Sequence, residues 1–374
     1  MKEGWKLERL LDVCDVYQPK TIATKDLVKD GLYLVYGANG IIGRYNMYNH
    51  EESEVLLTCR GATCGKINIS TPKSWINGNA MVVHPKDNAL SKNYLYFFLT
   101  TVDYSKVITG AAQPQITRLS LSDTLIPIPP LSEQQRIVEQ LDSAFAKIDA
   151  LKANAEKLVE EAKALFAASL REIMTPKKGW EEKKLGEVGE LKNGMNFGHN
   201  ESGIELHLLG VADFENKFSI ENTETLPLIS LNKRPNEEYL LKDDDIVFVR
   251  SNGNKHLVGR CVLVKSNGIS TSFSGFCIRF RTLNESLNPR FLVYYLKMPK
   301  TRKMLVGNGA NISNLNQKTL SMLPIHFPPL SEQTRIVSTL DTLSAQVRQL
   351  EDNFKKVSEE CDALKQAILR ETFE

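Results

Sequence analysis

The segment Pro129–Gln134 recurs letter for letter as Pro328–Gln333, with the sequence Pro-Pro-Leu-Ser-Glu-Gln in both copies. Each copy opens a long polar and apolar stretch, 131–174 and 330–374. The segments that begin at Gly4 and at Gly179 also match, because each continues with a tryptophan, a charged run, a leucine and a valine. A repeat of this size constrains the fold more than any single motif. It predicts two tandem halves, each a globular domain followed by a long helix.

Both long stretches have the apolar periodicity of a coiled-coil helix. From Ile137 and again from Ile336, apolar or small residues recur at alternating steps of four and three. A sustained heptad predicts a narrow seam between two helices. The predicted seam residues are Ile137, Leu141, Ile148, Leu151, Leu158, Leu165, Ile336, Leu340, Val347, Leu350, Phe354, Val357, Leu364 and Ile368. The alternative is that each helix is buried only on its own domain.

Chain connectivity favours antiparallel pairing of the two helices. About 40 helical residues span roughly 60 Å, whereas a domain of about 150 residues has a radius of gyration of only ~15 Å. The segment 175–329 begins where the first helix ends and finishes where the second begins. Antiparallel helices bring both ends of this domain to one tip of the pair. The repeat then places the first domain at the other tip, which predicts a dumbbell with a pseudo-twofold axis.

The globular segments have the pattern of α/β domains with short strands. Short apolar runs predict buried strands at 55–58, 80–83, 245–249, 262–264 and 277–280, and helices at 95–99 and 291–296. The predicted fold class is therefore α/β. Two globular domains, 1–130 and 175–329, are separated by an antiparallel two-helix coiled coil made of 131–174 and 330–374, in a pseudo-twofold tandem repeat.

Charge is divided between the domains and the helices. Lys+Arg against Asp+Glu is 14 to 12 in residues 1–130 and 21 to 16 in residues 175–329, but 6 to 8 and 6 to 9 in the helical stretches. A polyanion is therefore expected on the domains. No run approaches 18 uncharged apolar residues and the N-terminus is charged, which predicts a cytoplasmic protein with no membrane partner. The six cysteines lack CxxC spacing, which predicts reduced structural thiols.

Common enzyme motifs fail in this sequence. Gly37–Gly43 has the spacing GxxGxxG instead of GxGxxG, and Gly61–Ile67 is one residue short of a phosphate-binding loop. HExxH, GxSxG and paired-cysteine zinc motifs do not occur. The run Asp243–Asp245 could serve a metal-dependent nuclease, but we interpret it as the turn before a strand. The sequence predicts a chain without catalytic residues, metal ligands or a cofactor of its own.

Six polar, glycine-rich loops interrupt the two domains. Glycine permits close backbone approach, and Arg, Lys, Asn and Gln are the side chains that read guanine and adenine edges. The predicted DNA-contacting residues are Arg44, Asn46, Arg60, Lys66, Gln113, Gln115, Arg118, Arg250, Asn252, Lys255, His256, Arg260, Asn308 and Asn311. Ordinary turn chemistry is the alternative for any one loop.

The whole chain resembles the specificity subunit of type I restriction–modification systems. The resemblance is carried by Pro-Pro-Leu-Ser-Glu-Gln-x-Arg-Ile-Val at Pro129–Val138 and Pro328–Val337, and by Trp5 and Trp180. It implies a non-catalytic protein in which each globular domain is a target-recognition domain for one half of a bipartite site in double-stranded DNA. The helices would set the spacer between the halves.

The resemblance also implies partners. Methyltransferase subunits, expected to number two, would dock on the chain, and ATP-driven restriction subunits would join them. S-adenosylmethionine, ATP and Mg are expected on those partners. The alternative function is a coiled-coil scaffold whose globular ends bind other proteins.

Overall fold

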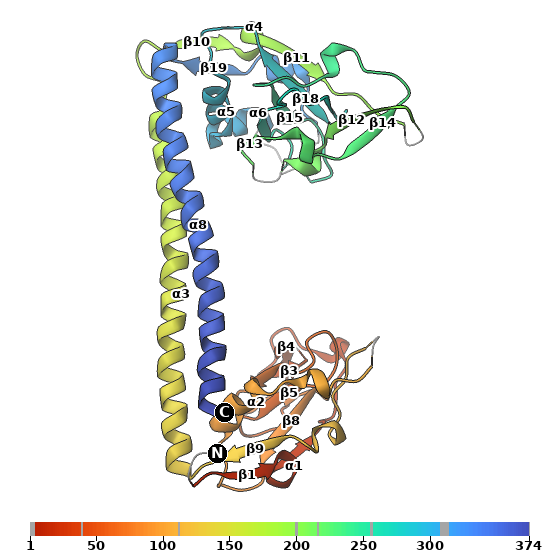
Figure 1. The fold of residues 1–374 in the computed structure, drawn as a ribbon, viewed down its shortest axis with the longest axis vertical. Coiled ribbons are helices and arrows are strands. Elements are labelled where there is room, and N and C mark those ends of the chain that lie inside the picture. The colour runs from red at the N-terminus through yellow and green to blue at the C-terminus, as the bar shows by residue number, and fades with distance from the viewer. Residues whose placement is uncertain are drawn as a thin grey trace. The chain divides into compact units, whose positions relative to one another are not determined.

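The computed structural model describes residues 4–38, 40–110, 113–198, 201–214, 217–254, 257–306 and 314–373 (Figure 1). The chain divides into two compact units. The first consists of Met1–Lys157 and Asp352–Glu374, and the second of Leu158–Glu351. Each unit thus combines one globular domain with segments of both long helices.

The two long helices begin directly after the repeated Pro-Pro pairs. Helix α3 spans Leu131–Ile173 and helix α8 spans Leu330–Phe373. In the first unit, Lys365 of α8 pairs with Asp149 of α3 at 2.5 Å, and Asp362 pairs with Lys152 at 3.1 Å. The residue numbers rise along α3 while they fall along α8, so the helices are antiparallel there, as predicted.

The same direction holds in the second unit. Leu170 and Met174, near the end of α3, share a hydrophobic core with Ile336 and Leu340, near the start of α8. In the first unit, Ile137 and Leu141 share a core with Leu369. The start of each long helix is therefore buried in the globular domain that precedes it, as well as on its partner helix.

The seam differs from the predicted heptad at five positions. Leu151, Leu158 and Leu165 are 57%, 59% and 65% exposed, and Leu350 and Leu364 are also exposed. The residue one position later is less exposed in each case: Val159 is buried, and Lys152, Phe166, Glu351 and Lys365 are half-buried. The reason is that an undistorted α-helix has 3.6 residues per turn and drifts by about 20° per heptad from a strict 3.5-residue repeat.

The remaining predicted seam residues lie inward. Ile137, Leu141, Ile148, Ile336 and Leu340 are buried. Val347, Phe354, Val357 and Ile368 are half-buried.

Among its described residues, the first globular domain contains two sheets of three or more strands and one two-stranded sheet. The larger has the order β2-β8-β5-β6, formed by Cys14–Tyr17, Ala80–Pro85, Val55–Thr58 and Ile67–Ile69. The smaller has the order β4-β3-β7, formed by Gly40–Tyr45, Tyr33–Gly37 and Trp75–Ile76. Strand β1 (Lys6–Arg9) pairs with β9 (Leu125–Ile128), which closes the domain. The helices are α1 (Leu10–Val13) and α2 (Lys92–Thr101).

The second globular domain repeats this topology. Its larger sheet has the order β11-β18-β15-β16-β13, formed by Gly189–Asn193, Cys277–Thr282, Ile246–Val249, Cys261–Val264 and Ser219–Ile220. Its smaller sheet, β14-β12-β17, is formed by Leu228–Leu231, Ile204–Leu209 and Thr271–Phe273. Strands β3 and β7 pair in parallel, as do β12 and β17. Every strand of the first domain thus has a counterpart in the same order, and β13 is an addition.

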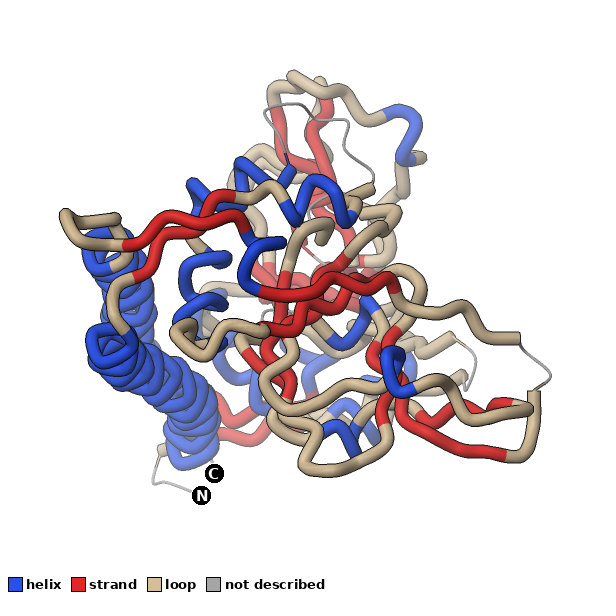
Figure 2. The backbone as a smooth tube through the Cα atoms, turned by 90° about the horizontal axis from the view of Figure 1, so that it is seen from above, coloured by secondary structure: helices blue, strands red, loops and turns tan. Residues whose placement is uncertain are grey.

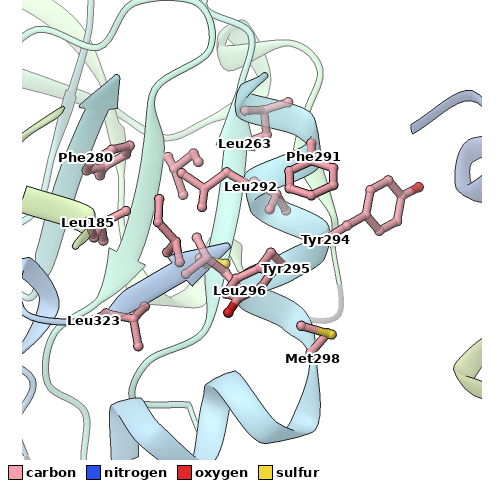
Figure 3. Close-up of a cluster of buried hydrophobic side chains, with 14 of the residues drawn as sticks. Leu185, Leu263, Phe280, Phe291, Leu292, Tyr294, Tyr295, Leu296, Met298 and Leu323 are labelled. Atoms are coloured by element: carbon pink, nitrogen blue, oxygen red, sulfur yellow. The ribbon is translucent and has the colours of Figure 1, made fainter. Parts of the chain in front are cut away.

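The closing strand pair of the second domain has a counterpart in the first, and two of its described helices, those after β10 (Glu181–Lys184) and after β18, correspond to α1 and α2. Strand β10 pairs with β19 (Pro324–Phe327). The helices are α4 (Leu185–Val188), α5 (Pro289–Lys297), α6 (Pro299–Val306) and α7 (Gln317–Ser321). Figure 3 shows α5 beside the sheet, with Leu292 and Leu296 on the side of Phe280 and Leu185, and Phe291 and Leu263 belong to the same core. The predicted strands and helices are all present, and long loops join them (Figure 2).

The repeated glutamine fastens each long helix to its domain. Gln134 is fully buried; its Oε1 accepts the Ser91 N–H at 2.8 Å, and its Nε2 donates to the carbonyls of Ala89 and Pro129. Gln333 is also fully buried and makes the equivalent bonds, to the N–H of Asn288 and the carbonyls of Ser286 and Pro328. Ser91 and Asn288 are the N-cap residues of α2 and α5. This network explains why the glutamine is identical in both copies.

All six cysteines are free, as predicted. Burial raises the pKa of the Cys14 and Cys277 thiols to about 12, so both are neutral near pH 7. Within the described ranges, none of the helices is both long enough and apolar enough to cross a membrane.

Candidate nucleic-acid interface

In the first domain, two of the predicted loops meet at the end of the central strand β5. Arg60 follows β5 and forms an isolated antiparallel bridge with Gln115. The Ile116 N–H donates to the Cys59 carbonyl at 3.0 Å, and the Gly61 N–H donates to the Pro114 carbonyl at 3.1 Å. The structure therefore brings Arg60 and Gln115 side by side. Gln113 is exposed two residues earlier on the same loop.

The loop after β5 is held by its own backbone. The Thr58 N–H donates to the Lys66 carbonyl and the Gly65 N–H to the Thr58 carbonyl, each at 2.8 Å. Gly61 and Gly65 both have φ of 93°, a left-handed conformation that glycine adopts without strain. Burial raises the pKa of the Cys64 thiol, which keeps it protonated. Lys66 is exposed at the base of this loop.

The other predicted residues of the first domain lie apart from this pair. Arg44 is opposite Leu34 in the β3–β4 hairpin and donates to the Gly31 carbonyl at 3.3 Å. The turn of the hairpin is at its other end, and there the Ala38 carbonyl accepts a hydrogen bond from the Thr58 hydroxyl at 2.5 Å. Ala38, and not Arg44, therefore contacts the end of β5. Arg118 is exposed just before a short 3₁₀ turn.

The second domain has the same arrangement at the end of its central strand β15. Ser251 forms an isolated antiparallel bridge with Asn314, and the Leu315 N–H donates to the Arg250 carbonyl at 2.7 Å. The Arg250 side chain donates through Nη1 to the Gly275 carbonyl at 3.3 Å. Ser251 and Asn314 thus stand where Arg60 and Gln115 stand in the first domain.

The remaining predicted residues of the second domain have varied positions. Asn252 accepts the Asn254 N–H at 2.7 Å, which is the bonding of a tight turn. Arg260 is half-buried, and its carbonyl accepts the Val249 N–H at 2.8 Å. Four predicted residues lie outside the described residues: Lys255, His256, Asn308 and Asn311.

Ser251 and Asn314 are not among the residues predicted from the sequence, although the sequence holds a signal for Asn314. Ile116 lies as far before the first Pro-Pro-Leu-Ser-Glu-Gln copy as Leu315 lies before the second. Both residues are buried. Counting back from the repeated motif in each half therefore aligns Asn314 with Gln115.

The acidic run Asp243–Asp245 is structural. Asp243 accepts the Ser266 N–H and hydroxyl, which lowers the pKa of its carboxyl group. Asp244 pairs with Lys265 at 2.6 Å, and the buried Asp245 accepts two hydrogen bonds from Arg281, each at 2.7 Å. The run therefore shapes the turn before β15, as we interpreted it from the sequence.

Comparison with known proteins gives one family. A family model described as "Type I restriction modification DNA specificity domain" matches residues 2–161 and 177–357. The StySPI specificity subunit of Salmonella potsdam is 30% identical over 303 residues, which cover 76% of this chain and 65% of that subunit. The EcoKI specificity subunit of Escherichia coli is 24% identical over 377 residues, with 96% and 76% covered. The chain thus spans just under two thirds of the StySPI subunit.

Solved structures share the fold. A chain from a study titled "Structural basis underlying complex assembly and conformational transition of the type I R-M system" superposes with a TM-score of 0.75 and 20% identity, covering 100% of this chain and 98% of its own. The HsdS subunit from Thermoanaerobacter tengcongensis gives a TM-score of 0.58 and 19% identity, with 100% and 97% covered.

Proposed function

Because the chain belongs to the type I restriction–modification DNA specificity family, we propose that it is a non-catalytic specificity subunit that recognises a bipartite site in double-stranded DNA. The observation that carries this proposal is that the two domains have the same backbone arrangement at the end of the central strand but different side chains there. Arg60 and Gln115 end the central strand of one domain, whereas Ser251 and Asn314 end that of the other. Two equally built surfaces with unlike chemistry suit two unlike half-sites.

The proposed division of the chain follows from the repeat. Residues 1–130 and 175–329 are the target-recognition domains, and 131–174 and 330–374 are the helices that set the spacer. Exposed cations such as Lys66 would contact phosphates and so position each domain, while side chains at the loop ends would read base edges. The excess of Lys and Arg over Asp and Glu in both domains supports this assignment.

The proposed partners are methyltransferase subunits that dock on the repeated element. Its buried members, such as Gln134 and Gln333, are explained by the fold. Leu131 and its counterpart Leu330 are exposed in both copies, and no contact within the described residues explains their repetition. Arg136 and its counterpart Arg335 are exposed beside them, and Arg136 is oriented by two hydrogen bonds to Glu133. One surface presented twice suits two copies of one partner. Restriction subunits would join this cytoplasmic complex, and S-adenosylmethionine, ATP and Mg would be bound by the partners.

The test uses the complex with its methyltransferase subunits. Methylome sequencing of a host that carries them should give a bipartite motif, and a duplex with that motif should bind tightly. We expect affinity to fall steeply with salt, because phosphate contacts release counterions. Arg60→Ala should weaken binding by about tenfold or more and relax specificity in one half-site only. A complex that assembles but binds no DNA would contradict the proposal and favour the protein scaffold.

A further inference from the structure

A third position accompanies the two that form the strand-end bridges. In the first domain the Cys59 N–H donates to the Asn79 carbonyl at 3.1 Å, and in the second the Arg250 N–H donates to the Phe276 carbonyl at 2.7 Å. The next residues, Ala80 and Cys277, open strands β8 and β18 opposite the last residues of β5 and β15. Asn79 and Phe276 therefore occupy equivalent places.

Each of these residues stands on a turn whose backbone is fixed. Gly78 precedes Asn79, and a Cβ at Gly78 would lie 2.7 Å from the Pro19 carbonyl oxygen, so only glycine fits there. In the second domain Gly275 precedes Phe276, and the Gly275 N–H donates to the Met195 carbonyl at 2.8 Å. The Phe276 N–H donates to the Ser274 hydroxyl at 3.3 Å. The side chains that follow these glycines are therefore presented from a rigid base.

The side chains themselves are directed to solvent. Asn79 is exposed, and Phe276 is 58% exposed although the strand that it precedes is buried from Cys277 to Phe280. An exposed aromatic ring on a rigid turn is unfavourable in water and suits an apolar contact with a partner. The Arg250 guanidinium is held beside the same turn by the Gly275 carbonyl, which gives that partner a cationic neighbour. A partner that carries apolar groups on a negatively charged backbone fits an exposed aromatic ring beside a guanidinium group.

We propose that three equivalent positions form the base-reading face of each domain: Arg60, Asn79 and Gln115 in the first, and Ser251, Phe276 and Asn314 in the second. Phe276 makes an apolar contact with the methyl group of a thymine in the major groove, and Asn79 pairs with an adenine edge. The inference rests on the proposed function, because it names the residues that read each half-site. Its basis is that the backbone bonds agree between the domains while all three side chains differ.

The experiment for Phe276 uses duplexes in which each thymine of one half-site is replaced in turn by uracil, which lacks the methyl group. The wild-type complex should lose about fivefold or more in affinity at one position. The Phe276→Ala complex should bind the unmodified duplex about as weakly as the wild-type complex binds the uracil-containing duplex. Uracil at that position should not weaken its binding further. The matched control is Leu283→Ala, because Leu283 is 70% exposed at the other end of β18. It should behave like the wild type.

The companion experiment concerns the other half-site. Asn79→Ala should relax methylation specificity at one adenine-containing base pair and weaken binding by about tenfold, whereas the exposed Asn88→Ala, beyond the other end of β8, should change nothing. Unchanged thermal unfolding and partner assembly would show that the variants fold. If wild-type complex binds in a salt-dependent way but Phe276→Ala and Asn79→Ala match it, this inference is overturned and the proposed function stands. If the wild type does not bind, the proposed function itself fails.

Discussion

The glutamine of the Pro-Pro-Leu-Ser-Glu-Gln motif has the same structural role in both copies. Gln134 and Gln333 each join three backbone segments: the start of a long helix, the proline before it, and the loop that leads into α2 or α5. A buried amide can do this because it offers both an acceptor and two donors. Neither a carboxylate nor an aliphatic side chain of similar size can satisfy the same three groups.

Gln134→Leu should therefore destabilise the protein strongly. The substitution removes the hydrogen-bond partner of the Ser91 N–H and of the Ala89 and Pro129 carbonyls, and a buried polar group left unpaired costs about 1–3 kcal/mol. We expect a loss of about 2–4 kcal/mol in the free energy of unfolding, measured with urea. The control is Gln135→Leu, because Gln135 is exposed and its side chain bonds only Glu139 among the described contacts. Similar losses in both variants would contradict the role assigned to Gln134.

At the scale of elements, the short apolar runs predicted the buried central strands β5, β8, β15, β16 and β18 and the helices α2 and α5, but not the other strands. Val55–Thr58 and Ile246–Val249 are buried on both faces, so their continuous apolar sequence was a sufficient signal. The parallel pairing of β3 with β7 had no such signal, because it joins segments far apart in the sequence. The seam of the helices was predicted only in part. Leucines at heptad spacing were assigned to it even where the helix has rotated them away from the partner helix.

Adjacent residues of α3 test this seam directly. Val159 is buried, whereas Leu158 is 59% exposed. Val159→Asp should lower the free energy of unfolding by about 2 kcal/mol or more, because it places a charge in a packed interface. Leu158→Asp should change it by less than about 0.5 kcal/mol in the isolated chain. The strict heptad predicts the opposite order, so urea unfolding of the two variants distinguishes the two seams.

At the scale of the whole molecule, the two globular domains share one topology although their sequences differ. The repeat was visible only at its ends, from Trp5 to Val13 with its copy and in the two Pro-Pro-Leu-Ser-Glu-Gln elements. Between these ends the strands keep their order because backbone hydrogen bonds and apolar burial define them, and many residues satisfy both. The loop ends carry no such constraint. The sequence does not show which polar loop residues lie together at the strand ends, as the placement of Arg44 away from Arg60 illustrates.

The helix pair offers the last prediction, which concerns the spacing of the half-sites. Inserting seven residues after Lys157 in α3 and seven after Lys356 in α8 adds about 10 Å to each helix, the rise of about three base pairs. The preferred gap in the DNA site should lengthen by about that amount, as read by methylome sequencing, while both half-sites keep their sequence. Binding should also weaken, because three base pairs turn the duplex by roughly 100° whereas seven residues turn a helix by about 20° from its starting phase. The same insertion in α3 alone should disrupt the pairing of the helices, and an unchanged gap with both insertions would mean that the helices do not set it.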